Sequence, residues 1–195
     1  MAYELLRHMD LAMSPAPAEE SAVTDFALLL LRALGYTRRG RVFRTRKDIP
    51  LVICGEMSHA KRDVVYDNEI LLLVQEDKSH LQISDPEPQL IAQAIAAFAA
   101  NNRIRQQTLA QSPLSSKLIA GITMKGTAPI FYKLNVTTEL ITSVGGGVYP
   151  DIPTIVYAYI PSIPRPNRCW REGMKALDNR RIILSCYEAF KKFVN

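Results

Sequence analysis

Apolar residues recur at helical spacing between Ser14-Pro15 and Gly35. The Ser-Pro pair is a helix-start signal and Gly35 is a suitable C-terminal cap, so a helix is predicted between them. Leu28 to Leu31 run without interruption, which is typical of a helix packed on more than one side, as in an α/β layer. Residues 1–13 are expected to form a short helix or an arm.

Shorter apolar runs after Gly35 predict strands. The basic segment 38–47 is interpreted as a strand or a hairpin edge, and residues 51–54 as a short strand ended by Gly55. Residues 64–66 and 70–74 predict two further strands. The second of these is apolar on both faces, which places it in the centre of a sheet.

The rest of the chain predicts a second helix, more strands and a third helix. Residues 84–87 read Ser-Asp-Pro-Glu, a helix-start signal, and the helix is expected to end at Asn101-Asn102. The C-terminal residues from Ile182 to Phe193 have one broad apolar face, which predicts a helix. Between these helices, four runs are expected to extend the sheet in antiparallel fashion: 118–124, 129–136, 139–144 and 154–160.

Composition indicates one ordinary globular domain. The chain has 195 residues, of which 48% are hydrophobic and 22% charged. A net charge of +5 and a pI near 9.2 favour polyanionic partners only modestly, because the same charge also serves solubility. Three distant cysteines have no zinc-site spacing, and no signal peptide or membrane-spanning run is recognised, so an intracellular protein, cytoplasmic or nuclear, is expected.

The most informative chemistry is the hairpin that carries Asp63 and ends in Glu76 and Lys78. The side-chain period of a strand puts Glu76 and Lys78 on one face, and the hairpin could bring Asp63 onto that face. Two acids and an amine together suit metal-assisted cleavage of a phosphodiester. An acid-x-lysine triplet arises about once by chance in such a chain, so its position at the end of a central strand carries the argument.

The register of this hairpin is left open by the sequence. A two-residue turn at Asp67-Asn68 would leave Asp63 roughly 13 Å short of Glu76, too far for one metal ion. A four-residue loop would place Asp63 opposite Val74 and diagonal to Glu76, about 7–8 Å apart between backbones. A larger loop or a bulge would bring the two acids directly opposite.

The pattern Asp-x12-Glu-x-Lys resembles that of the PD-(D/E)XK nuclease superfamily. The strings 59–64, 71–78 and 85–98 are similar to those of a group of uncharacterised fungal proteins assigned to this fold. Arg62 stands where the short motif has proline. The resemblance implies an α/β fold with a restriction-endonuclease-like αβββαβ core, a mixed sheet flanked by helices, an antiparallel strand extension and a C-terminal helix. It implies a single domain over 1–195, with the core at about 15–136 and the extension at about 137–195.

The resemblance also implies roles for individual residues. Asp63 and Glu76 would hold Mg²⁺ or Mn²⁺ with a backbone carbonyl of Gln75 or Asp77, and Lys78 would act on the attacking water. An added acid is expected from the first helix. Glu20 is favoured over Glu19, although both could be ordinary first-turn acids. Four accessory candidates, each with an ordinary structural explanation as well, are Glu56, His59, Gln89 and Gln93.

The expected function is metal-dependent hydrolysis of phosphodiester bonds, with DNA favoured over RNA. The alternative is a catalytically inactive module of the same fold that binds nucleic acid or a protein, and Lys78 could be a structural ion-pair partner. The sequence leaves monomer and homodimer open and suggests no membrane partner. Phosphate contacts are expected from a basic stretch that could equally be a charge-protected edge strand: Arg38, Arg39, Arg41, Arg44, Arg46 and Lys47.

Overall fold

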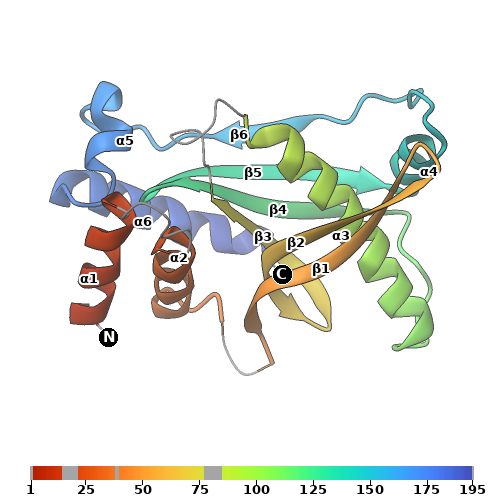
Figure 1. The fold of residues 1–195 in the computed structure, drawn as a ribbon, viewed down its shortest axis with the longest axis horizontal. Helices are drawn as coiled ribbons and strands as arrows, with labels where there is room; N and C mark the ends of the chain where they lie inside the picture. The colour runs from red at the N-terminus through yellow and green to blue at the C-terminus, as the bar shows by residue number, and fades with distance from the viewer. Residues whose placement is uncertain (1, 15–21, 38–39, 77–84, 195) are drawn as a thin grey trace.

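A computed structural model describes residues 2–14, 22–37, 40–76 and 85–194, with the side chains of residues 60–62 and 76 outside the description. Its centre is a mixed sheet of six strands in sequential order (Figure 1). The strands are β1 Val42–Ile53, β2 Glu56–Asp67, β3 Glu69–Glu76, β4 Ser116–Lys125, β5 Ala128–Thr137 and β6 Val156–Tyr159.

All neighbouring strands are antiparallel except β3 and β4, which run parallel. A parallel pair needs a crossover connection, and helix α3, Glu87–Gln107, lies within it. β1 and β6 are the two edges of the sheet. The change from antiparallel to parallel pairing therefore occurs at β3, the central strand that carries Glu76.

Helices cover both faces of the sheet, so the protein has three layers (Figure 1). Helices α1, Ala2–Met13, α2, Ala22–Ala33, and α6, Leu177–Phe190, share a core with one face. Helices α3 and α4, Thr138–Gly146, share a core with the other. The remaining elements are short: the 3-10 turns η1, Pro166–Arg168, and η2, Lys191–Phe193, and helix α5, Cys169–Glu172.

Side chains alternate between the two cores along the central strand. Leu72 and Val74 of β3 pack in the core under α2 and α6, whereas Leu73 packs in the core under α3. All three are at most 4% exposed. This double burial explains why the segment is apolar on both faces, and it confirms the predicted central strand.

The predicted α/β class with a mixed sheet flanked by helices is confirmed. The order α2, β1, β2, β3, α3, β4 is the predicted order of helix, three strands, helix and strand. The helix in residues 1–13 and the C-terminal helix are also present. β5 and β6 extend the sheet in antiparallel fashion as predicted, whereas the run 118–124, expected to do the same, joins β3 in parallel as β4. None of the helices among the described residues is long and apolar enough to cross a bilayer.

The prediction of a strand at 139–144 is wrong, because this segment is helix α4. Thr137 caps the helix by accepting a hydrogen bond from the backbone N–H of Leu140 at 3.1 Å. Gly147 ends it in the left-handed conformation, with φ of 69°, which glycine adopts without a steric penalty. The two caps outweigh the β-branched composition of the segment.

Two predicted boundaries also change. Helix α3 continues past Asn101-Asn102 to Gln107, because both asparagine side chains bond to other segments instead of ending their own helix. Residues 42–47 of the basic segment and residues 51–53 lie in one strand, β1, which is irregular between Arg44 and Lys47. The first strong helix is described from Ala22, so its predicted start at Ser14-Pro15 falls partly outside the described residues.

Candidate functional site

The β2–β3 hairpin has one of the registers that the sequence left open. Asp63 lies opposite Val74. The turn is tight, with Asp67 opposite Glu69 and Asn68 in the left-handed region at φ of 55°. A register shift that leaves Leu71 unpaired then restores the same spacing as a four-residue loop.

The pairing of β2 with β3 ends at Asp63 and Val74. Among the described residues beyond this point, β3 is paired with β4 as far as Glu76 opposite Met124, and β2 is paired with β1. Glu76 follows Val74 by two residues, so it belongs to the same face of the strand as Val74 and Asp63. The two acids therefore lie where the two strands part.

Asp63 is held by one donor from the helix layer and one from the edge strand. The hydroxyl of Thr24, in the first turn of α2, donates to Oδ2 at 3.1 Å. The backbone N–H of Arg46 donates to Oδ1 at 3.0 Å. Arg46 lies in the irregular part of β1 with φ of 51°, a conformation that is uncommon for a residue with a side chain. The β1 bulge thus aims a backbone donor at the carboxylate.

The other members of the predicted catalytic set are only partly described. The structure describes the backbone of Glu76 but not its side chain. Asp77, Lys78, Glu19 and Glu20 fall in segments that the structure does not describe. Within the described residues, no group of three or more His, Cys, Asp or Glu side chains is arranged to hold a metal ion.

The three glutamines lie on the face opposite Asp63. The Gln75 side chain points toward α3 and donates from Nε2 to Oε1 of Gln89 at 2.8 Å. Gln93, one turn further along α3, is 2% exposed, and its amide has no hydrogen-bond partner among the described residues. These side chains are separated from Asp63 by the sheet itself.

Glu56 and His59 do not approach Asp63 either. Both are exposed on β2, and Nδ1 of His59 lies 3.1 Å from Oδ2 of Asp48 on β1. His59 shares the strand face of Asp63 but precedes it by four residues, a distance of roughly 13 Å along a strand. The structure therefore places this pair on the β1–β2 hairpin, away from the acids.

The basic stretch divides among three environments. Arg41 donates to the carbonyl of Val194 at 2.9 Å and so fixes the C-terminal end of the chain. Arg44 and Lys47 lie over the ring of Tyr66, with Lys47 Nζ 4.3 Å from its centroid. Partial burial lowers the pKa of Lys47, and the neighbouring charge of Arg44 lowers it further.

Arg44 and Arg46 are exposed, whereas Lys47 is half-buried. Arg38 and Arg39 lie outside the described residues. Tyr66 packs against the core under α3, so Arg44 and Lys47 are on the sheet face opposite Asp63. Arg44 and Arg46 are the two arginines of this stretch whose described side chains are open to a polyanion.

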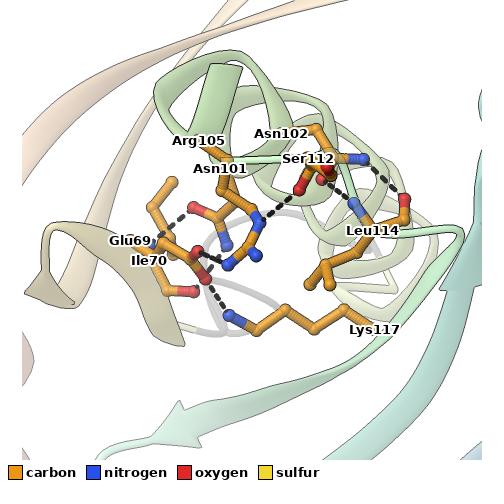
Figure 2. A network of polar contacts seen from close by, with 8 residues as sticks. All are labelled: Glu69, Ile70, Asn101, Asn102, Arg105, Ser112, Leu114 and Lys117. Carbon is orange, nitrogen blue, oxygen red and sulfur yellow. Dashed lines mark hydrogen bonds and ion pairs between the residues drawn. The ribbon is translucent and has the colours of Figure 1, made fainter. Parts of the chain in front are cut away.

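A polar cluster at the start of β3 was not foreseen from the sequence (Figure 2). Glu69 accepts a hydrogen bond from Arg105 of α3 at 2.9 Å and another from Lys117 of β4. Burial alone would raise the pKa of Glu69, but these two hydrogen bonds and the two positive charges outweigh burial and lower it. In the sequence, the only signal of this cluster is a glutamate at the start of an apolar strand. Its two partners are 36 and 48 residues away, so local spacing does not identify them.

Two asparagines extend this cluster, and each side-chain amide bonds to both the N–H and the carbonyl of one backbone residue, as a neighbouring strand would. Asn101, 1% exposed, accepts from the N–H of Ile70 at 2.6 Å and donates to its carbonyl at 2.9 Å. Asn102 makes the same pair of bonds with Leu114, at 2.8 and 2.9 Å (Figure 2). The start of β3 is thereby clamped to α3, which fixes the strand whose other end carries Glu76.

Comparison of the chain with protein-family models and with curated proteins gives no match.

Proposed function

We propose that this protein is a metal-dependent nuclease-like protein of the PD-(D/E)XK type that hydrolyses phosphodiester bonds. The observation that carries the proposal is the register of the β2–β3 hairpin, in which Asp63 lies opposite Val74. Glu76 follows two residues later on the same strand face, in a sheet with the element order αβββαβ. In a continuing antiparallel ladder such diagonal neighbours are about 7–8 Å apart, a spacing that two carboxylate side chains could close onto one ion.

The surroundings of Asp63 suit a hard divalent cation. Each carboxylate oxygen accepts one described hydrogen bond, from Thr24 or from Arg46. A carboxylate offers about four lone-pair sites, so lone pairs remain for a metal ion. Mg²⁺ and Mn²⁺ prefer such oxygen ligands, and Asp63 with Glu76 would hold the ion.

A bound divalent cation would supply Lewis acidity to the scissile phosphate and to a coordinated water. Asp63 is oriented for this role by its two donors, which limit the rotation of its carboxylate. Lys78, two residues after Glu76, is proposed to orient the attacking water and to stabilise the charge that develops on the phosphate. Asp63, Glu76 and Lys78 would act as one unit.

DNA is the proposed substrate class. Arg46 is exposed on the edge strand and contributes its backbone N–H to Asp63, while Arg44 is exposed on the same strand but on the other face of the sheet. A guanidinium group can contact phosphate oxygens in a bidentate manner, so a duplex that contacts this edge would lie close to the carboxylate. The net charge of +5 favours the approach of such a polyanion.

The test is incubation of the purified protein with supercoiled plasmid, linear duplex, single-stranded DNA and RNA in Mg²⁺ or Mn²⁺. Cleavage that EDTA stops and that Asp63→Asn abolishes is the expected result. Asp67→Asn is the matched control, because Asp67 lies on the same strand and pairs with Arg41 at 3.7 Å. No cleavage of any substrate, or equal cleavage by both variants, would refute the catalytic assignment and favour a binding module.

A further inference from the structure

The two edges of the sheet differ in a way that the proposed function does not explain. The β1 edge carries Arg44, Arg46, Lys47 and Asp48, and charged side chains of this kind keep an exposed edge from pairing with another strand. The β6 edge, Val156–Tyr159, has no charged residue. Among the described residues, no strand pairs with its outer side.

The absence of charge extends well beyond β6. Asp151 is the only charged residue between Gly145 and Pro164, in a chain of which 22% is charged. Large apolar side chains in this segment are exposed instead of packed. They are Val148 (66%), Tyr149 (95%), Ile152 (68%), Ile155 (64%), Tyr157 (55%), Tyr159 (52%) and Ile160 (54%).

The apolar surface offered by these side chains is large for one chain. From their exposed fractions and typical side-chain areas it is on the order of 600 Å². The largest apolar patch of a typical monomer is about 300–600 Å², and it is often functional. A dimer interface of standard size buries about 800 Å² per partner, roughly two-thirds of it apolar. The segment 148–160 thus supplies the apolar area that one stable dimer interface needs.

We infer that the β6 edge is the interface between two copies of this chain, joined by antiparallel pairing of β6 with β6 across a two-fold axis. An antiparallel pair is self-complementary, so one edge can serve both copies. The charge distribution favours a second copy of the chain as the partner at this edge. Segment 148–160, in which Asp151 is the one charged residue, suits a second copy better than a polyanion, and the arginines of β1 lie at the opposite edge.

A pocket beside this edge gives the interface a place for an aromatic anchor. It has a volume of about 380 Å³ and is lined by apolar side chains that include Leu118, Leu140 and Ile155, and also by Lys133 and Glu139. Aromatic side chains seated in pockets account for much of the binding energy at interfaces. Tyr149 is nearly fully exposed in the single chain, and we assign it as the anchor that becomes buried in the dimer.

Sedimentation velocity of the full chain over a range of about 1 to 100 µM tests the inference. The expected result is a concentration-dependent dimer. Ile155→Lys should raise the dissociation constant at least about tenfold, because it places a charge in an apolar interface. Tyr149→Ala should also weaken the dimer, and it changes a side chain too exposed to support the monomer fold.

Matched controls separate the interface from general surface chemistry. Leu177→Lys and Tyr3→Ala change apolar residues that are 58% and 78% exposed on α6 and α1, outside the segment 148–160, and should leave the dimer unchanged. A protein that stays monomeric throughout, or a dimer that Ile155→Lys and Tyr149→Ala leave intact, would overturn the inference. Neither result depends on nuclease activity, so the inference and the proposed function fail or succeed separately.

Discussion

Thr24→Val tests whether the helix layer positions the candidate metal ligand. Thr24 is 39 residues from Asp63 in sequence, and its hydroxyl donates to Oδ2 at 3.1 Å. Valine removes the hydroxyl but keeps the β-branched shape, and the helix propensities of the two residues are similar. The substitution therefore changes the support of the carboxylate with little effect on α2 itself.

The size of the effect can be worked out from the geometry. A hydrogen bond to a charged group contributes about 1.5–3 kcal/mol, and 3.1 Å is long for an O–H···O bond, so the lower end applies. About 1.5 kcal/mol corresponds to roughly a tenfold loss of metal affinity. This agrees with the loss of about 10–100-fold that is typical when a residue supporting a metal ligand is removed. The backbone N–H of Arg46 remains in the variant, so affinity should be reduced and not abolished.

Titration of Mn²⁺ into the protein, followed by calorimetry, measures this affinity directly. Thr24→Ser retains the hydroxyl and should bind close to wild type. Thr142→Val is a control for loss of a helical threonine hydroxyl, because Thr142 donates to the carbonyl of Thr138 in its own helix at 2.9 Å. Equal Mn²⁺ affinity for wild type and Thr24→Val would refute the positioning role, as would equal losses for the valine and serine variants.

Three other changes probe the fold and the basic edge. The pKa of Glu69 is lowered, so its ion pairs stabilise the protein above the ordinary pKa of 4.5 and lose this effect as the pH falls below it. The melting temperature of Glu69→Gln should therefore fall less than that of wild type between pH 7 and pH 3. An equal fall for both proteins would contradict this. Asn101→Leu leaves two backbone groups of Ile70 unpaired, so the free energy of unfolding measured by urea denaturation should fall by about 3 kcal/mol. A fall of less than about 1 kcal/mol would show that another group replaces the amide. The double variant Arg44→Gln, Arg46→Gln should bind DNA more weakly than wild type. The slope of log binding constant against log salt concentration should become shallower by about 0.9 for each phosphate that the protein no longer neutralises. An unchanged slope would show that this edge does not contact DNA.

The layer order was predictable from the sequence because hydrophobic periodicity is a local property. The run 70–74 is buried on both faces, and the sequence shows this directly as a strand apolar at every position. Helix α4 was missed because its termini, and not its interior, specify the helix. Thr137 and Gly147 supply the two caps, while the residues between them include β-branched types that favour strands.

The site was predictable only as far as local spacing reaches. Strand alternation correctly places Asp63 and Val74 on one face, but the register depends on a tight turn at Asn68 compensated by a bulge at Leu71. The turn and the bulge together set the register, so the register could not be predicted from the turn length alone or from the bulge alone. The residue that holds Asp63 from the helix layer, Thr24, contacts it only because α2 packs on that face, which is a tertiary effect.

The glutamines show how face assignment limits prediction from motifs. Gln89 and Gln93 are correctly placed on the second helix, but that helix covers the face of the sheet that Gln75 shares and Asp63 does not. The distinction depends on the packing of α2 and α3 in the cores on opposite faces of the sheet, which is a tertiary arrangement. Sequence spacing within one helix does not carry this information.

The most direct test of the central claim is whether Asp63 and Glu76 hold one divalent cation between them. Mn²⁺ binding to wild type, Asp63→Asn, Glu76→Gln and the double variant, measured by electron paramagnetic resonance, provides it. One bound Mn²⁺, lost in each single variant and not weakened further in the double variant, is the result that this account predicts. Mn²⁺ that binds equally to all four proteins, or to none, would contradict a shared site and with it the proposed chemistry.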